Sequence, residues 1–383
     1  MYKHFVDFIR TLYDTPAGYI PLHEPRFIGN EKKYVLDCID STFVSSTGAY
    51  VDKVSSDLCK ITGAKFAIPV VNGTAALHLS LVVAGVKQND EVITQALTFI
   101  ATANAISYIG AIPHFVDVDK DTMGMSPSLL RNYLTGIAEL KNGHCYNKLT
   151  GRRIAACVPM HTFGLPLRIE ELAKVCADFN LVLIEDAAES LGSTVHGKHT
   201  GLSGLMGTLS FNGNKIVTSG GGGAIITNNA DLGAKLKHLS TQAKVPHAFE
   251  YNHDAIGYNY RMPNINAALA CAQLEQLPFF LEDKRAVATA YHEYLADSTD
   301  LVCVKEREGT VSNYWLNAVV LKDKNHRDEF LNFMTAHEIM VRPIWNLMNH
   351  LEMYKSMPAA NLDNSEFLAE RVVNITSSAR AKK

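Results

Sequence analysis

A single lysine stands after an apolar run and before four consecutive glycines in the stretch SFNGNKIVTSGGGG, residues 210–223. A lysine amine attacks an aldehyde only when part of it is neutral, which requires cover from water or nearby positive charge. Lys215 is the only charged residue between Thr208 and Gly223, which suits a covered site. The glycines allow the backbone to approach a flat ligand closely. On this stretch alone, Lys215 is either a nucleophile that forms a Schiff base or an exposed loop lysine.

The stretch NGTAAL, residues 72–77, could hold an anion. It follows a short apolar run and opens a helical pattern. Gly73 and Thr74 therefore fall at a helix N-terminus, whose free N–H groups bind phosphate readily. Asn72 or Thr74 could instead serve only as the helix cap. The sequence contains neither G-x-G-x-x-G after a predicted strand nor G-x-x-x-x-G-K-[ST], so it supports neither a dinucleotide-binding fingerprint nor a P-loop.

Asp186 follows the apolar run LVLIE. A carboxylate at the end of a strand faces either solvent or a ligand, and a buried carboxylate needs a partner. We interpret Asp186 as a solvated strand end unless a cationic nitrogen of a ligand lies beside it.

The elements that would position these residues alternate along the first two thirds of the chain. Short apolar runs without polar alternation, typical of strands covered on both faces, are separated by helical patterns. We predict strands at residues 65–71, 90–95, 112–119, 154–161, 181–187, 207–212 and 222–229, and helices at 73–85, 99–110 and 169–180. The pattern predicts an α/β fold with a mainly parallel central sheet flanked by helices. Ligands bind at the carboxyl ends of the strands in such sheets, where the three stretches above fall.

The pattern changes after about residue 265. Helical patterns dominate there and are followed by a shorter α+β segment. We therefore predict a large domain over residues 1–265, including an N-terminal segment, and a small C-terminal domain over residues 266–383.

The composition is that of an ordinary globular protein, with 47% hydrophobic and 20% charged residues among 383 and a net charge of -3. Without an excess of positive charge, we expect no nucleic-acid partner. Seven scattered cysteines without C-x-x-C spacing predict reduced thiols, a cytoplasmic location and no metal site. Residues 93–116 lack charged side chains over a length that could span a bilayer, but polar residues, Gly110 and Pro113 interrupt them. We predict a buried strand, helix and strand there and no membrane contact.

A phosphate-binding helix N-terminus, an acid for a ring nitrogen, an aldehyde-trapping lysine and a stacking aromatic such as Phe99 are together the parts of a pyridoxal 5'-phosphate site. The chain resembles the sugar aminotransferases of the DegT/DnrJ/EryC1/StrS family, a subgroup of the fold-type I pyridoxal-phosphate enzymes. The resemblance covers nearly the whole chain. It rests on the order and spacing of FVSSTGAYVDKVSSDLCKITGAKFAIPVVNGTAALHLSL, TFIATANAI, VPMHTFGLP, IEDAAESLGS, SFNGNK, GGGGAIIT and IGYNYRMPNINAALACAQLEQL. Within the family, PLHEPRFIGNEKKYVLDCIDSTFVSSTG is most similar to LegC-like 4-aminotransferases, which act on UDP-linked 4-keto-6-deoxy-N-acetylhexosamines.

The resemblance implies a role for each residue at the cofactor. Lys215 would form a Schiff base with the cofactor and later move the proton between the substrate carbon and C4' of the cofactor. Asp186 would keep the pyridine nitrogen protonated, and Phe99 would stack on one face of the ring. Glu189 would lie near the ring hydroxyl, where many relatives carry Gln or His.

The resemblance also implies how the phosphate and the subunits are arranged. Gly73, Thr74, the Ala75 N–H and Ser210 would hold the phosphate. Asn259, in the motif GYNYRM, would reach the cofactor of a neighbouring subunit. We therefore expect a homodimer with shared active sites.

For the substrates, the resemblance implies that L-glutamate converts the cofactor to pyridoxamine 5'-phosphate and leaves as 2-oxoglutarate. The amino group would then pass to C4 of a UDP-linked 4-keto sugar. Candidate cations for the uridine diphosphate are Arg26, Lys32, Arg261 and Arg342. We favour Arg342, because residues 341–349 correspond to the family's segment that closes over the active site. His161 matches a strand-end histidine of the family and is a further candidate for substrate binding.

Several alternatives stay open on the sequence. Related dehydratases carry a histidine where this chain has Lys215. The lysine therefore favours amine transfer over dehydration. A 3-keto aminotransferase or a lyase on the same fold would also keep the lysine. A non-enzymatic protein could retain the fold as well, although the pair Lys215 and Asp186 argues against this. The sequence does not identify the sugar or the configuration of its C4 amine.

Overall fold

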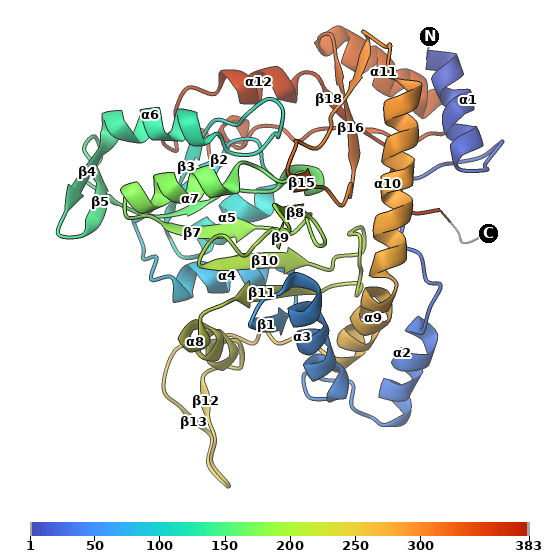
Figure 1. Ribbon diagram of the computed structural model, residues 1–383. Coiled ribbons are helices and arrows are strands. Elements are labelled where there is room, and N and C mark those ends of the chain that lie inside the picture. The colour runs from blue at the N-terminus through green and yellow to red at the C-terminus, as the bar shows by residue number, and fades with distance from the viewer. Residues whose placement is uncertain (1, 381–383) are drawn as a thin grey trace.

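The computed structural model describes residues 2–380 and is built around one large sheet (Figure 1). The strands of its main path, in spatial order, are β1 (Phe66–Val70), β11 (Gly223–Thr227), β10 (Met206–Ser210), β7 (Val182–Asp186), β6 (Arg153–Val158), β2 (Glu91–Gln95) and β3 (Ile112–Val116). From β10 to β3 every neighbouring pair is parallel, whereas β11 is antiparallel to both β1 and β10. A hairpin of β4 (Ala138–Lys141) and β5 (His144–Asn147) pairs with β6. The predicted α/β fold with a mainly parallel central sheet is confirmed.

Helices cover both faces of this sheet. They are α4 (Gly73–Val83), α5 (Ile100–Tyr108) and α8 (Ala230–Ser240) on one face, and α6 (Pro127–Ile137) and α7 (Ile169–Asp178) on the other. Val92 of β2 packs in one cluster with Leu77 and Ile106, whereas the next residue, Ile93, packs in another with Leu134. Successive side chains of a strand point to opposite faces, so both are buried. This double cover explains the unalternated apolar runs in the sequence.

A second, antiparallel sheet follows in the C-terminal part of the chain. It comprises β14 (Leu301–Cys303), β16 (Asn317–Leu321), β18 (Val372–Ile375) and β17 (Arg342–Pro343), with α10 (Leu277–Tyr294), α11 (Lys324–Ala336) and α12 (Asp363–Ala369) nearby. The N-terminal helix α1 (Tyr2–Leu12) also packs here, because Phe5 and Ile9 share a core cluster with Tyr291 and Phe330. The N-terminal segment thus contacts elements of the predicted small domain, and the division at residues 265 and 266 stays a prediction.

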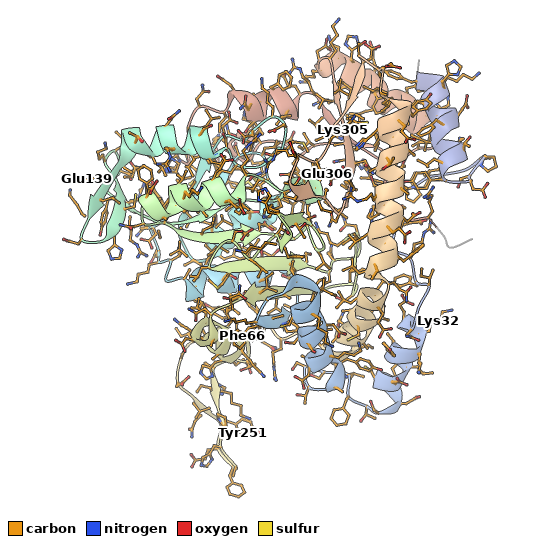
Figure 2. The ribbon with its side chains drawn as sticks, in the orientation of Figure 1. Lys32, Phe66, Glu139, Tyr251, Lys305 and Glu306 are labelled. Carbon is orange, nitrogen blue, oxygen red and sulfur yellow. The ribbon has the colours of Figure 1, made fainter. Side chains whose placement is uncertain are left out.

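The remaining elements connect these two parts or project from them. Helices α2 (Glu31–Asp40) and α3 (Ala49–Thr62) pack on α9 (Asn264–Glu275). A small sheet joins β8 (Thr194–Val195), β9 (Lys198–His199) and β15 (Thr310–Val311). A hairpin of β12 (Lys244–Val245) and β13 (Asn252–His253) extends away from the body of the molecule (Figure 1), and Tyr251 lies on this projection (Figure 2). Short 3-10 turns cover Thr162–Gly164 and Met348–His350.

Most strands end slightly before their predicted limits, and the two largest differences have local reasons. The strand predicted at residues 154–161 ends at Val158, where Pro159 brings no N–H to a ladder. The strand predicted at residues 112–119 ends at Val116, and the Asp117 carboxylate then accepts the Ser365 N–H at 2.8 Å. No helix within residues 2–380 is long and apolar enough to cross a membrane. Over the same residues, no group of three or more His, Cys, Asp and Glu side chains could hold a metal ion.

Candidate active site

A cavity of about 320 Å³ lies at the carboxyl ends of the central strands. Its lining residues come from segments far apart in the sequence: Asn72, Gly73, Thr74, Leu77, Phe99, Ala101, Met160, Asp186, Ala188, Glu189, Ser210, Asn212, Asn214, Lys215, Trp315 and Trp345. The volume is in the range of small-molecule pockets. Seven of the residues selected from the sequence thus meet at one cavity: Gly73, Thr74, Phe99, Asp186, Glu189, Ser210 and Lys215.

Lys215 is a covered lysine, so its interpretation as an exposed loop residue is wrong. Its side chain is only 12% exposed, and Nζ lies 3.1 Å from Glu189 Oε1. Nζ also lies over the ring of Trp315, 3.9 Å from the centroid. The indole N–H of Trp315 donates to the carbonyl of Asn214 at 2.7 Å, which fixes the loop beside the lysine. Lys215 therefore has a carboxylate and an aromatic face as its two nearest charge-stabilising neighbours.

The glycines after Lys215 allow β11 to pass close to the start of α4. A Cβ atom on Gly223 would lie 2.6 Å from Asn72 C and 2.7 Å from Gly73 N, closer than side chains approach backbone. Gly223 is paired with Ser210 in the register of β10 and β11. The missing side chain of Gly223 thus brings Ser210 beside the helix N-terminus.

The N-terminus of α4 supplies anion-binding groups. Asn72 Oδ1 accepts the Ala75 N–H at 2.7 Å, so the helix cap uses this N–H in the structure, and its role in holding a phosphate stays a prediction. The N–H groups of Gly73 and Thr74 stand in the first turn, where α-helical geometry provides no acceptor. Ser210 Oγ would lie 3.3 Å from a Cβ atom on Gly73, so the hydroxyl closes the same cradle.

Asp186 also lines the cavity and is buried, so its interpretation as a solvated strand end is wrong. It is 2% exposed, and its carboxylate accepts the Thr102 hydroxyl at 2.7 Å and the Ala188 N–H at 3.2 Å. Burial raises the pKa of Asp186 above its ordinary value, and these hydrogen bonds and the Lys215 charge oppose the shift. A carboxylate has about four acceptor positions, so Asp186 can accept a further N–H from a ligand.

Glu189 is the second buried acid of the cavity. It is 3% exposed, and its other oxygen, Oε2, accepts the Phe163 N–H at 2.8 Å. Burial raises the pKa of Glu189, and the positive charge of Lys215 is the main opposing influence. The cavity therefore combines two buried carboxyl groups with a single lysine.

These groups fit pyridoxal 5'-phosphate. The cradle of Gly73, Thr74 and Ser210 matches a phosphate, and Asp186, buried without a cationic partner, matches a protonated ring nitrogen. Lys215 carries the amine that an aldehyde requires. The chemistry that such a set supports is covalent capture of a carbonyl, followed by proton transfer.

Aromatic side chains form the mouth of the cavity. Phe99 is 48% exposed, so it is not a core residue, and its ring lies 6.1 Å from that of Trp345. Trp345 also contacts Phe163 at a centroid distance of 5.0 Å. Trp315 and Trp345 were not selected from the sequence. The only signal for Trp345 was the segment 341–349, expected to close over the site, and for Trp315 there was none.

Three other candidates do not line this cavity. His161 is fully buried, with Nε2 2.9 Å from Glu185 Oε2 and Nδ1 accepting the Leu167 N–H, so its expected role in substrate binding is wrong. Arg26 donates to the Ala379 carbonyl at 2.9 Å and pairs with Glu24, which ties the N-terminal segment to the C-terminal one. Arg342 is exposed on β17, and Trp345 reaches the cavity in its place.

The remaining candidates lie on other surfaces. Arg261 lines a separate cavity of about 260 Å³, together with Thr47 and Lys237. Asn259 is exposed and pairs with Thr241 outside the active-site cavity. Lys32 is exposed on α2 (Figure 2). None of these three reaches Lys215 within one chain, as far as the described residues extend.

Comparisons with known proteins agree with this geometry. The sequence profile of the DegT/DnrJ/EryC1/StrS aminotransferase family matches residues 25–382. The chain is 37% identical over 337 residues to GDP-perosamine synthase of Escherichia coli O157:H7, covering 88% of this chain and 87% of the relative. It is 35% identical over 363 residues to GDP-perosamine synthase of Vibrio cholerae, covering 94% of each. The crystal structure of DesI in the presence of its TDP-sugar product matches with a TM-score of 0.82 and 26% identity, covering 96% of this chain and 90% of that one.

The burial of Asp186 predicts a pH-dependent effect of Asp186→Asn on stability. The folded protein holds the Asp186 proton more tightly than the unfolded chain, because the folded-state pKa is raised. The stability that this bound proton adds is present in full below the pKa of Asp186 in the unfolded chain, and it is lost as the pH rises through the pKa of Asp186 in the folded protein. We therefore compare the unfolding temperatures of Asp186→Asn and the parent, both without added ligand. The unfolding temperature of the variant minus that of the parent should increase from about pH 4 to about pH 7.

The matched control is Asp297→Asn, at an exposed position on the surface. It should show no comparable increase in thermal-unfolding scans over the same pH range. We assign Asp186 as a buried carboxyl group whose ionised form is unfavourable. This assignment would be contradicted if the difference in unfolding temperature between Asp186→Asn and the parent stays constant or decreases with pH.

Proposed function

The chain belongs to the DegT/DnrJ/EryC1/StrS aminotransferase family and is a pyridoxal-phosphate-dependent sugar-nucleotide aminotransferase, and we propose that it moves the amino group of L-glutamate to C4 of a nucleotide-linked 4-keto-6-deoxy sugar. The observation that carries the proposal is the covered amine of Lys215, 3.1 Å from Glu189 in the same cavity as the α4 N-terminus and Asp186.

Each residue of the cavity has a role in this proposal. When bound, pyridoxal phosphate supplies an aldehyde and an electron-accepting ring. Lys215 Nζ would hold that aldehyde and, when free, would take a proton from the donor carbon and return one to the acceptor carbon. Asp186 would accept the N–H of the ring nitrogen and keep the proton there. Glu189 holds the ammonium of Lys215 when it carries the proton.

The walls of the cavity bind, orient and exclude water. The N–H groups of Gly73 and Thr74 and the hydroxyl of Ser210 would bind the phosphate. Phe99, half-exposed at the mouth, covers one face of the ring. Trp345, whose ring lies 6.1 Å from that of Phe99, and Trp315 add apolar surface to the lining, which would limit the access of water to the reacting carbon.

The nucleotide of the acceptor has two candidates. The resemblance of the N-terminal stretch to LegC-like enzymes supports a UDP-linked 4-keto-6-deoxy-N-acetylhexosamine. The names of two relatives, both GDP-perosamine synthases that match over most of the chain, support a GDP-linked 4-keto-6-deoxyhexose. Both acceptors share the C4 carbonyl on which the proposal rests, and the GDP-linked sugar is the first to test, because it follows from whole-chain similarity.

We also propose that the enzyme is a homodimer with shared active sites. Asn259 is exposed and outside its own cavity, so it is free to reach a second subunit. The neighbouring projection carries large apolar side chains that are almost fully exposed, with Phe249 at 90%, Tyr251 at 81% and Ile256 at 87%. Exposed apolar groups of this kind mark protein contacts.

The two half-reactions can be observed separately with the purified enzyme. L-glutamate alone should remove the visible absorption band of the bound cofactor and release one equivalent of 2-oxoglutarate per site, because donor and acceptor react in turn. Adding the GDP-linked or the UDP-linked 4-keto sugar should restore the band, and NMR of the product should place the new amine at C4. An amine at C3, or no 2-oxoglutarate, would contradict the proposal and favour a 3-keto aminotransferase or a lyase.

Lysine variants control this experiment. Lys215→Ala should lower the rate about 10²–10⁴-fold, as expected for the loss of an acid–base group. Lys60→Ala, at an exposed lysine on α3, should keep the rate of the parent.

Shared active sites predict complementation between two variants. Asn259→Ala should weaken cofactor binding about tenfold or more through loss of a charge-assisted hydrogen bond, and Lys215→Ala should keep only the strongly reduced rate given above. When equal amounts of the two variants are mixed and their subunits exchange, about half of the dimers are hybrids, and each hybrid has one intact site and one defective site. At limiting cofactor the mixture should therefore recover about a quarter of the parent activity. No recovery, in hybrids confirmed by native mass spectrometry, would place Asn259 in its own subunit's site.

A further inference from the structure

A second buried lysine lies behind the cavity, on α10. Lys284 is 1% exposed, and its Nζ donates to the carbonyl of Trp315 at 3.0 Å and to the carbonyl of Ser377. Trp315 is part of the cavity, whereas Lys284 does not line it. The ammonium of Lys284 thus joins the backbone behind the indole ring to the C-terminal segment.

Stability alone does not account for a lysine at this position. Burial lowers the pKa of Lys284 to about 7, and only the charge of Asp283 opposes this shift. Asp283 is itself bound by Arg380, whose Nε and Nη2 atoms donate to Oδ1 at 2.9 and 2.7 Å. Lys284 is therefore held by backbone carbonyls, and an apolar side chain of similar size would avoid the cost of burying its charge.

Trp315 connects Lys284 to the active lysine in two ways. Its indole N–H donates to the carbonyl of Asn214, the residue before Lys215, at 2.7 Å. Its ring face lies 3.9 Å from Lys215 Nζ. The backbone N–H of Trp315 donates to Asn313 Oδ1 at 2.9 Å, and the backbone carbonyl of Trp315 accepts from Lys284 Nζ. Both backbone polar groups of Trp315 are therefore fixed.

The N-terminal segment meets the same junction. The Ser377 N–H donates to the carbonyl of Leu22 at 2.7 Å, and the ring of His23 lies 6.5 Å from that of Trp315. Burial lowers the pKa of His23 well below its ordinary value, and the positive charges of Lys284 and Lys215 add to this effect. Lys284 thus stands where the first and last segments of the described chain meet the wall of the cavity.

We propose that Lys284 is a positioning residue for Lys215. By holding the carbonyls of Trp315 and Ser377, it fixes the orientation of the indole ring, which in turn fixes the loop and the ammonium of Lys215. The inference rests on the proposed role of Lys215 as the amine that binds the cofactor. It assigns no contact between Lys284 and the substrate.

The two tryptophans of the chain make this inference testable without any turnover. In a Trp345→Phe background, Trp315 is the only tryptophan, and its fluorescence reports the surroundings of the indole ring in protein without cofactor. We expect Lys284→Met in this background to shift the emission maximum of Trp315. We also expect it to slow the capture of added pyridoxal phosphate, followed by its visible band, about tenfold or more.

The matched control is Val287→Ala, which opens the core on the same helix without touching Trp315. It should lower the unfolding temperature but leave the Trp315 emission and the capture rate at the values of the background protein. If Lys284→Met does not fold, Lys284→Gln, which also removes the ammonium, is measured in the same way.

The inference is overturned if the Lys284 variant keeps both the emission maximum and the capture rate of the background protein. It is also overturned if Val287→Ala changes both to the same extent, since the role of Lys284 would then be structural only. A failure of the proposed role of Lys215 gives a different result, because capture with the visible band would then persist in Lys215→Ala.

Discussion

The burial of two carboxyl groups beside one lysine is the constraint on which the rest of the site depends. Glu189 pairs with Lys215 at 3.1 Å, so their charges balance within the cavity. Asp186 has only neutral donors, a hydroxyl and a backbone N–H, and burial raises its pKa. An unpaired buried carboxylate is costly, so the cavity favours a ligand that brings a cationic N–H to Asp186. The protonated pyridine nitrogen of the family's cofactor meets this requirement.

The fold supplies this arrangement from distant parts of the chain. The parallel pairing of β7 and β10 sets Asp186 opposite Thr208, two residues before Ser210, and thus places the acid and the hydroxyl at one edge of the sheet. The C-terminal part then adds Trp315 and Trp345, which complete the lining. Lys284 ties this C-terminal wall to the last described residues, so the amine is positioned by both parts of the molecule.

Residues at the end of a strand or shortly after it could be predicted from the sequence, because strand ends and helix starts are local features. Lys215, Asp186, Gly73 and Ser210 all belong to this class, and all line the cavity. The sequence left Asn72 and Thr74 as two possible caps, and in the structure Asn72 accepts the Ala75 N–H.

Contacts between distant segments could not be predicted in the same way. Trp315 lies 100 residues beyond Lys215 in the sequence, and no local pattern marks it as a neighbour. His161 stands at a strand end like the true lining residues, but its ring turns into the core toward Glu185. The direction of a side chain at a strand end depends on packing, which a single sequence does not reveal.

The most direct test of this account is the location of the covalent bond to the cofactor. The enzyme loaded with pyridoxal phosphate would be reduced with borohydride, digested and analysed by mass spectrometry. The account predicts that the added mass lies on the peptide that contains Lys215 and on no other lysine. A label on Lys284 or on a surface lysine, with Lys215 unmodified, would contradict the central claim that the Lys215 amine is the reactive group of the cavity.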